Sequence, residues 1–133
     1  MKIKMILPVL LLLLFSQAAL AEKVKILLHT SDKRNMAMVE QAVDNIIEEY
    51  GDNREVILVV NGAAVENFTR ALGKPEFVGN LLEQEVEIGV CHMALSRRGI
   101  HDEQVLDQVE VLESTGVVTI IRLQQQGYIY IKI

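Results

Sequence analysis

A single thiol and a few polar residues are the groups in this chain that could do chemistry. Cys91 is the only cysteine among the 133 residues, so the chain cannot form an internal disulfide. A lone thiol can act as a nucleophile, carry a sulfur atom, or pack as a small apolar side chain. Polar residues follow three apolar runs, and the candidate binding residues at these positions are His29, Thr30, Asn61, Gly62 and His92.

The apolar runs that end at these residues are predicted to be parallel β-strands. They cover residues 24–28, 55–60 and 86–90. Between the first two runs, apolar residues spaced by three and four from Met36 to Tyr50 predict an amphipathic helix that ends at Gly51. A strand, a helix and a second strand form a βαβ unit, whose two strands lie parallel.

The carboxyl ends of parallel strands meet at one edge of a sheet, where ligands of such sheets bind. The sequence therefore predicts that Cys91 lies near the candidate binding residues. Cys91 also precedes a predicted short helix from His92 to Arg98, whose N-terminus favours a thiolate. The alternative is a buried core cysteine, and position alone does not separate the two.

Arg97 and Arg98 are predicted to lie away from the sulfur of their own chain. A regular helix would place them roughly 9–10 Å along its axis from Cys91. They could complement the C-terminus of that helix, or face a neighbouring subunit or an anionic partner.

The remaining segments complete an α/β pattern in one domain. A short helix is expected from Ala63 to Leu72, with Val65, Phe68 and Leu72 on one face, and another from Pro75. Residues 109–112 and 128–133 are predicted strands. The segment 116–127 is ambiguous, because its β-branched residues favour a strand while its glutamines and final glycine favour a helix end. The fold class is α/β with a mainly parallel sheet.

The first residues have the pattern of a secretory signal peptide. Lys2 and Lys4 precede an apolar stretch from Met5 to Phe15, and the motif Ala-Leu-Ala at 19–21 suits cleavage before Glu22. The alternative is an uncleaved anchor, although a membrane span needs about 18 or more apolar residues. Residues 1–21 are therefore predicted to be removed, which leaves a periplasmic domain of residues 22–133 without a membrane segment.

The composition of that domain excludes several classes of function. Without Lys2 and Lys4, 11 basic residues remain against 18 acidic ones, a net charge of −7. Such a domain has no electrostatic reason to bind nucleic acid or anionic lipid. No phosphate-binding glycine motif is present, and no cofactor is predicted. The histidines His29, His92 and His101 lack the spacing of a metal site, so no metal is predicted. His29 could serve as the base of a hydrolase, but no sequence motif indicates an acyl-binding pocket.

Four segments together resemble a known family: KVKILLHTSD at the first strand, EVILVVNGAAV at the second, VEIGVCHMALSRRGI around Cys91, and GVVTIIRLQQQGYIYIKI at the end. They are similar to the DsrE/DsrF-like proteins, which are small α/β proteins of sulfur relay and sulfur oxidation. The last resembles the branch related to intracellular sulfur oxidation proteins. The similarity spans nearly all of residues 23–133.

The resemblance implies a five-stranded sheet with helices on both faces, and a helix over residues 117–126. It implies a trimer or hexamer, which could place Arg97, Arg98 or residues 124–126 beside a neighbouring subunit. It also implies that Cys91 carries a persulfide between a sulfur-donor and a sulfur-acceptor thiol protein, as the catalytic residue of a carrier or sulfurtransferase. Two alternatives remain, which are an oligomeric binding module with a structural Cys91 and a redox partner that forms mixed disulfides.

Overall fold

The computed structural model of the chain describes residues 21–133. In this part of the chain, five strands form one sheet in the order β4-β3-β2-β1-β5, and every neighbouring pair is parallel. The predicted single α/β domain is confirmed. The strands are β1 (Val24–Thr30), β2 (Arg54–Val60), β3 (Val86–Cys91), β4 (Glu110–Leu112) and β5 (Ile129–Lys132).

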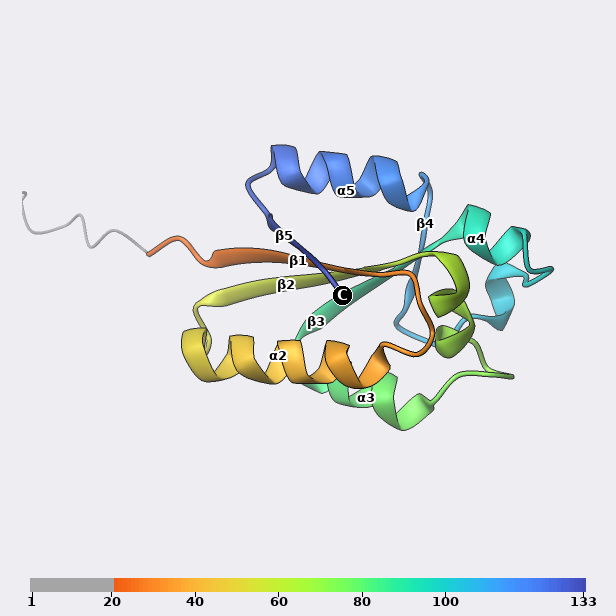
Figure 1. Cartoon of the computed structure of the whole chain (residues 1–133), viewed down its shortest axis with the longest axis horizontal. Helices are drawn as coiled ribbons and strands as arrows, with labels where there is room; N and C mark the ends of the chain where they lie inside the picture. The colour runs from red at the N-terminus through yellow and green to blue at the C-terminus, as the bar shows by residue number, and fades with distance from the viewer. Residues whose placement is uncertain (1–20) are drawn as a thin grey trace, which may run out of the picture.

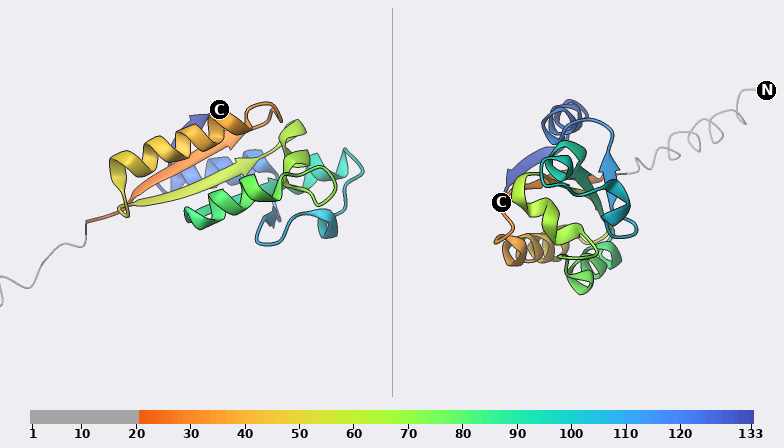
Figure 2. Two further views of the ribbon diagram at one scale, coloured as in Figure 1. Left: turned by 90° about the horizontal axis from the view of Figure 1, so that it is seen from below. Right: turned by 90° about the vertical axis from the view of Figure 1, so that its right-hand side faces the viewer.

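Helices cover both faces of the sheet, as Figures 1 and 2 show. On one face lie α2 and α3, and α5 lies on the other. The short helices α4, η1 and η2 gather near the carboxyl ends of the central strands. The helices are α2 (Met36–Tyr50), η1 (Gly62–Phe68), α3 (Pro75–Glu83), α4 (His92–Ser96), η2 (Asp102–Gln104) and α5 (Gly116–Gln125).

The alternation of strand side chains creates a separate core under each helical layer. Leu28 and Leu58 belong to the larger core under α2 and α3, whereas Leu27 and Val59 belong to the smaller core under α5. All four side chains are fully buried. The apolar runs of β1 and β2 are therefore nearly continuous because their strands are covered on both sides.

The register of the sheet aligns the ends of the three central strands. Thr30 pairs with Val60, and Val60 pairs with Val90. The residues next to these positions, His29, Asn61 and Cys91, consequently lie along one edge of the sheet.

The ambiguous segment 116–127 is a helix, as the family resemblance implied. The Thr115 side chain caps α5 by accepting a hydrogen bond from the Val118 N–H at 3.4 Å. Gly127 follows the helix with φ = 91°, a conformation that favours glycine. The β-branched residues are compatible with a helix because Ile120 packs on the smaller core while Val117 and Ile121 remain exposed.

The predicted helix from Ala63 to Leu72 is shorter in the structure, where η1 ends at Phe68. Thr69 forms an antiparallel bridge with Val105, so the chain leaves the helix there. Leu72 was expected on the apolar face with Val65 and Phe68, but it is 63% exposed. That expectation was wrong because periodicity does not reveal a tertiary bridge that ends a helix.

The predicted signal peptide lies, apart from Ala21, outside the described residues. Among the helices of residues 21–133, none has the length and apolar character required to cross a membrane.

Candidate functional site

Cys91 ends β3 and faces the N-terminus of a helix distant in the sequence. Its side chain is 5% exposed, and the Gly116 N–H donates a hydrogen bond to Cys91 Sγ at 3.4 Å. Gly116 is the first residue of α5, a helix of ten residues. The first amide groups of a helix lack partners within it and carry partial positive charge. This contact places a backbone donor at the start of α5 directly against the sulfur.

A cavity of about 320 Å³ opens beside the thiol. Its polar lining consists of amide, hydroxyl and guanidinium groups, and no Asp or Glu of the described chain lines it. The lining residues are Asn61, Gly62, Cys91, Met93, Ala94, Arg97, Arg98, Thr115, Gly116 and Val117. The cavity is therefore built from the ends of β2 and β3, from α4 with its following turn, and from the start of α5.

Arg97 and Arg98 line the cavity of Cys91, although a regular helix would have separated them from it. The predicted helix to Arg98 is shorter in the structure, because α4 ends at Ser96 and the chain turns at residues 97–99. Arg98 Nε donates to Glu66 Oε1 at 3.3 Å. No carboxylate within residues 21–133 forms an ion pair with Arg97.

Glu66 is held ionised by the basic groups around it. Lys33 Nζ donates to Glu66 Oε2 at 3.0 Å, and this hydrogen bond is the main cause of a lowered pKa at Glu66. Charge attraction from Lys33 and from Arg98 acts in the same direction. Glu66 thus stays charged and fixes Arg98 at the margin of the cavity.

A hydrogen-bonded row connects the outer strand β5 to the thiol cavity. The Tyr130 hydroxyl donates to His29 Nδ1 at 2.7 Å, and His29 Nε2–H donates to Asn61 Oδ1 at 3.0 Å. This assignment follows from the network, because a neutral imidazole has one donor and one acceptor nitrogen. It leaves the amide hydrogens of Asn61 available toward the cavity that this residue lines.

His29 is favoured in its neutral form. Burial lowers its pKa below the ordinary value of 6.5, and the positive charge of Lys132 acts in the same direction. The hydrogen bond to Asn61 opposes the shift but does not cancel it. His29 therefore keeps the donor and acceptor pattern that orients Asn61.

Gly62 allows the loops after β1 and β2 to approach each other. Its φ is +55°, and a Cβ atom there would lie 2.7 Å from the Ser31 carbonyl oxygen. A side chain at this position would be strained in both respects. Thr30, by contrast, does not line the cavity: it is fully buried, and its Oγ1 has no hydrogen-bond partner within residues 21–133.

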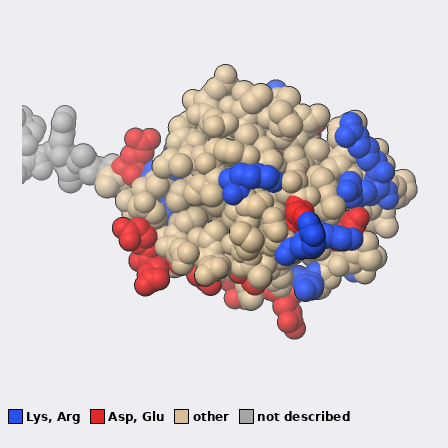
Figure 3. Space-filling view, viewed as in Figure 1, with Lys and Arg blue, Asp and Glu red and all other residues tan. Residues whose placement is uncertain are grey.

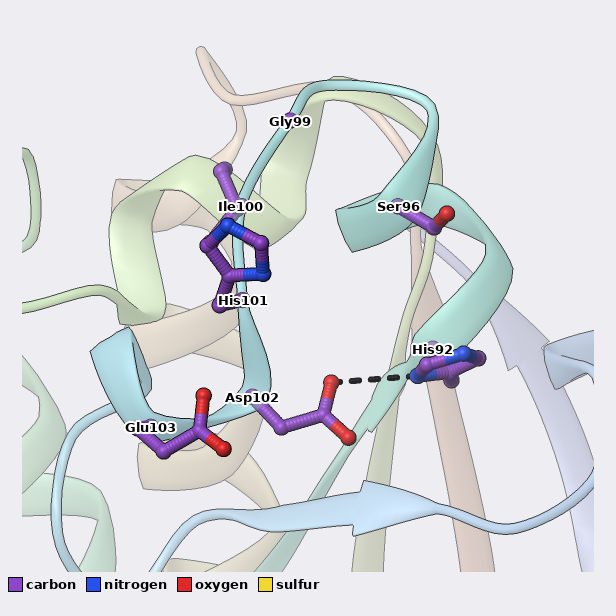
Figure 4. A pocket seen from close by; sticks show the side chains of 7 residues that line it. All are labelled: His92, Ser96, Gly99, Ile100, His101, Asp102 and Glu103. Atoms are coloured by element: carbon purple, nitrogen blue, oxygen red, sulfur yellow. Dashed lines mark hydrogen bonds and ion pairs between the residues drawn. The ribbon is translucent and has the colours of Figure 1, made fainter.

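His92 follows Cys91 in the chain but lines a different cavity. His92 Nδ1–H donates to Asp102 Oδ1 at 3.0 Å, and both side chains are about half exposed. Figure 4 shows this pair, which joins α4 to η2, with Ser96, His101 and Glu103 around a cavity of about 240 Å³. No cluster of three or more His, Cys, Asp or Glu residues suited to a metal ion occurs in residues 21–133.

The structure thus groups three predicted site residues, Cys91, Asn61 and Gly62, on one cavity, and His29 reaches it through Asn61. Sequence reasoning missed Gly116 and Thr115. A signal for them existed, because Thr115-Gly116 opens the ambiguous segment with a capping residue, but only the fold shows that this helix starts at the thiol.

Comparison with known proteins identifies the family. The sequence profile of the DsrE/DsrF-like family matches residues 13–133. Among solved structures, the protein of unknown function MTH1491 from Methanobacterium thermoautotrophicum is similar at a TM-score of 0.76 and 23% identity, over 84% of this chain and 100% of that one. The ychN protein from E. coli is similar at a TM-score of 0.65 and 15% identity, over 83% and 100%. No curated protein sequence matches. The chain therefore belongs to the DsrE/DsrF-like family.

Proposed function

We propose that the protein is a periplasmic sulfur carrier that holds sulfane sulfur as a persulfide on Cys91. Its family supports a sulfur-relay-related role. The observation that carries the proposal is the hydrogen bond from the Gly116 N–H to Cys91 Sγ, beside a cavity that a donor can enter. The predicted signal peptide supports the compartment, and N-terminal sequencing of exported protein is expected to start at Glu22.

The proposed loading step needs no external oxidant. The Cys91 thiol releases its proton to solvent, and the thiolate attacks the outer sulfur of a donor persulfide. A new S–S bond forms at Cys91 while the S–S bond of the donor breaks, and the donor leaves as a thiolate with the electron pair. An acceptor thiolate then attacks the outer sulfur on Cys91 and regenerates the Cys91 thiolate.

Intact mass spectrometry after incubation with polysulfide tests the proposal. The purified protein is expected to gain the mass of one sulfur atom, and a later incubation with a small thiol is expected to remove it. The Cys91→Ser variant should gain no mass. The proposal fails if the wild type stays unmodified or if the variant gains the same sulfur.

The near-complete burial of Cys91 favours a second candidate, in which the cysteine is structural and the protein is a binding module. In that case alkylation of Cys91 would be slow at neutral pH, and Cys91→Ala would keep normal function. A redox partner would instead form a mixed disulfide through Cys91, which non-reducing gels of periplasmic extract would show as a Cys91-dependent dimer or adduct.

A further inference from the structure

We propose that the cavity beside Cys91 binds a small sulfur oxyanion that carries a sulfane sulfur, with Arg97 holding its anionic group. Thiosulfate is the smallest compound of this class. The inference rests on the proposed function, because it names the kind of donor that loads Cys91.

The charge around the cavity is opposite to that of the domain. Residues 22–133 carry a net charge of −7, yet two guanidinium groups and no carboxylate of the described chain line this cavity. Figure 3 shows basic atoms at the end of the molecule where α4 and its following turn lie, and acidic atoms mainly at the opposite end and along the lower edge. A local positive potential in an acidic protein attracts anions to this cavity specifically.

Arg97 is the guanidinium that remains available for a ligand. Arg98 is engaged by Glu66, whose pKa is lowered chiefly by Lys33, so that ion pair persists at neutral pH. Arg97 is exposed and forms no ion pair with a carboxylate in the described part of the chain. A guanidinium can bind an oxyanion through two parallel N–H groups.

Two other donors of the cavity, the Gly116 N–H and the Asn61 amide, lie beside the thiol. The amide hydrogens of Asn61 remain available because His29 occupies its Oδ1. A Cβ atom at Gly116 would lie 3.5 Å from Cys91 Cβ and 3.6 Å from Asn61 Nδ2. The Asn61 amide and the Cys91 side chain therefore both lie next to Gly116. An anion can therefore contact Arg97 at one end while its sulfane sulfur meets Cys91 at the other.

The size of the cavity favours a small ligand. Pockets for small molecules occupy roughly 300–1,000 Å³, and this one, at about 320 Å³, is at the lower end.

The transfer of sulfur from thiosulfate to Cys91 balances in atoms and electrons. The Cys91 thiolate attacks the sulfane sulfur, the bond between the two sulfur atoms of thiosulfate breaks, and sulfite leaves with the electron pair. Arg97 then stabilises the charge that develops on the leaving sulfite.

Alkylation of Cys91 by iodoacetate and by iodoacetamide tests the anion site without sulfur chemistry. The two reagents differ chiefly in charge, so the ratio of their rates reports anion recognition. We expect Arg97→Gln to lower the iodoacetate rate by about threefold or more, as loss of a nearby unit charge should, while the iodoacetamide rate changes little. Arg97→Lys should restore most of the ratio.

Arg122→Gln is the matched control, because Arg122 lies in α5 outside this cavity and its loss removes the same net charge. Its rate ratio should equal that of the wild type. The inference is overturned if Arg97→Gln leaves the ratio unchanged or if Arg122→Gln lowers it equally.

Sulfur loading separates the two proposals. If polysulfide loads Cys91 and thiosulfate does not, the inference about the donor is wrong and the carrier function stands. If neither compound loads Cys91, the carrier function is wrong, and the alkylation ratio alone decides whether the cavity recognises anions. Loading by thiosulfate with release of sulfite, slower in Arg97→Gln, supports both.

Discussion

At the scale of residues, the row Tyr130–His29–Asn61 is the feature that prepares the cavity. Tyr130 of β5, His29 of β1 and Asn61 directly after β2 are joined in this order by hydrogen bonds. The row fixes which atoms of Asn61 face His29 and which remain for the cavity. A fixed donor beside the thiol costs no reorganisation when charge develops on sulfur.

The lowered pKa of His29 predicts a pH-dependent stability. The folded state keeps the imidazole neutral in a pH interval where the unfolded chain, with a pKa near 6.5, already binds a proton. The contribution of His29 is therefore fully present above about pH 6.5 and is lost as the pH falls toward its lowered pKa.

Urea denaturation between about pH 7.5 and about pH 5.5 measures this effect. The wild type is expected to lose more free energy of unfolding over this range than His29→Gln, whose side chain does not titrate. Equal losses in the two proteins would contradict the assignment of His29 as the neutral partner of Asn61.

At the scale of elements, the site depends on α5 starting where β3 ends. Cys91 and Gly116 are separated by 25 residues in the chain, and the Thr115 cap fixes the first turn of α5 against the thiol. The short helix α4 contributes in another way, because the turn that follows it carries Arg97 and Arg98, which line the cavity. Two helix ends, rather than one helix, therefore build the site.

The strands and the long helix α2 could be predicted from the sequence because their burial imposes a local pattern. The apolar runs of β1 and β2 and the spacing from Met36 to Tyr50 record which side chains face a core. The common edge that holds His29, Asn61 and Cys91 then followed from parallel strands. Each of these predictions uses only residues that are close together in the sequence.

The contacts that complete the site could not be predicted, because they join segments distant in the sequence. Nothing near Cys91 indicates that Gly116 will donate to its sulfur. The distance along a helix also gave no indication that Arg97 and Arg98 would line the cavity of Cys91. Similarly, nothing in the sequence indicated that the His92 side chain would pair with Asp102 outside the thiol cavity.

At the scale of the whole molecule, exposed apolar residues gather on α5 and β5. The strand β5 pairs only with β1 among the described strands, so one of its edges is open. An open edge and exposed apolar side chains favour association with another chain. The exposed apolar residues of these two elements are Val117, Val118, Ile121, Ile129, Tyr130 and Ile131.

We expect the protein to form a trimer or hexamer in which α5 or β5 is covered. Light scattering coupled to size exclusion measures the mass of the assembly. Ile121→Glu places a charge on α5 and Ile129→Glu places one on β5, and at least one of the two should lower that mass. Met38→Glu changes a similarly exposed residue on α2 and should not. A monomeric wild type would contradict the expectation, and dissociation by Met38→Glu alone would place the interface on the other face.

The central claim is that the Gly116 amide activates Cys91 for sulfur loading, and two variants of Gly116 test it. Replacing the Thr115–Gly116 amide by an ester, through chemical ligation, exchanges the N–H for an oxygen atom and so removes the donor without adding atoms beside Cys91 Sγ. Gly116→Ala keeps the donor, and its Cβ would lie in ordinary contact at 3.5 Å from Cys91 Cβ.

The measurement is the rate at which polysulfide adds one sulfur atom to Cys91, followed by intact mass. A hydrogen bond to a charged group contributes about 1.5–3 kcal/mol, so the ester variant should load about tenfold or more slowly than Gly116→Ala. Equal rates in the two variants, with both proteins folded, would contradict the claim that this amide makes Cys91 a sulfur carrier.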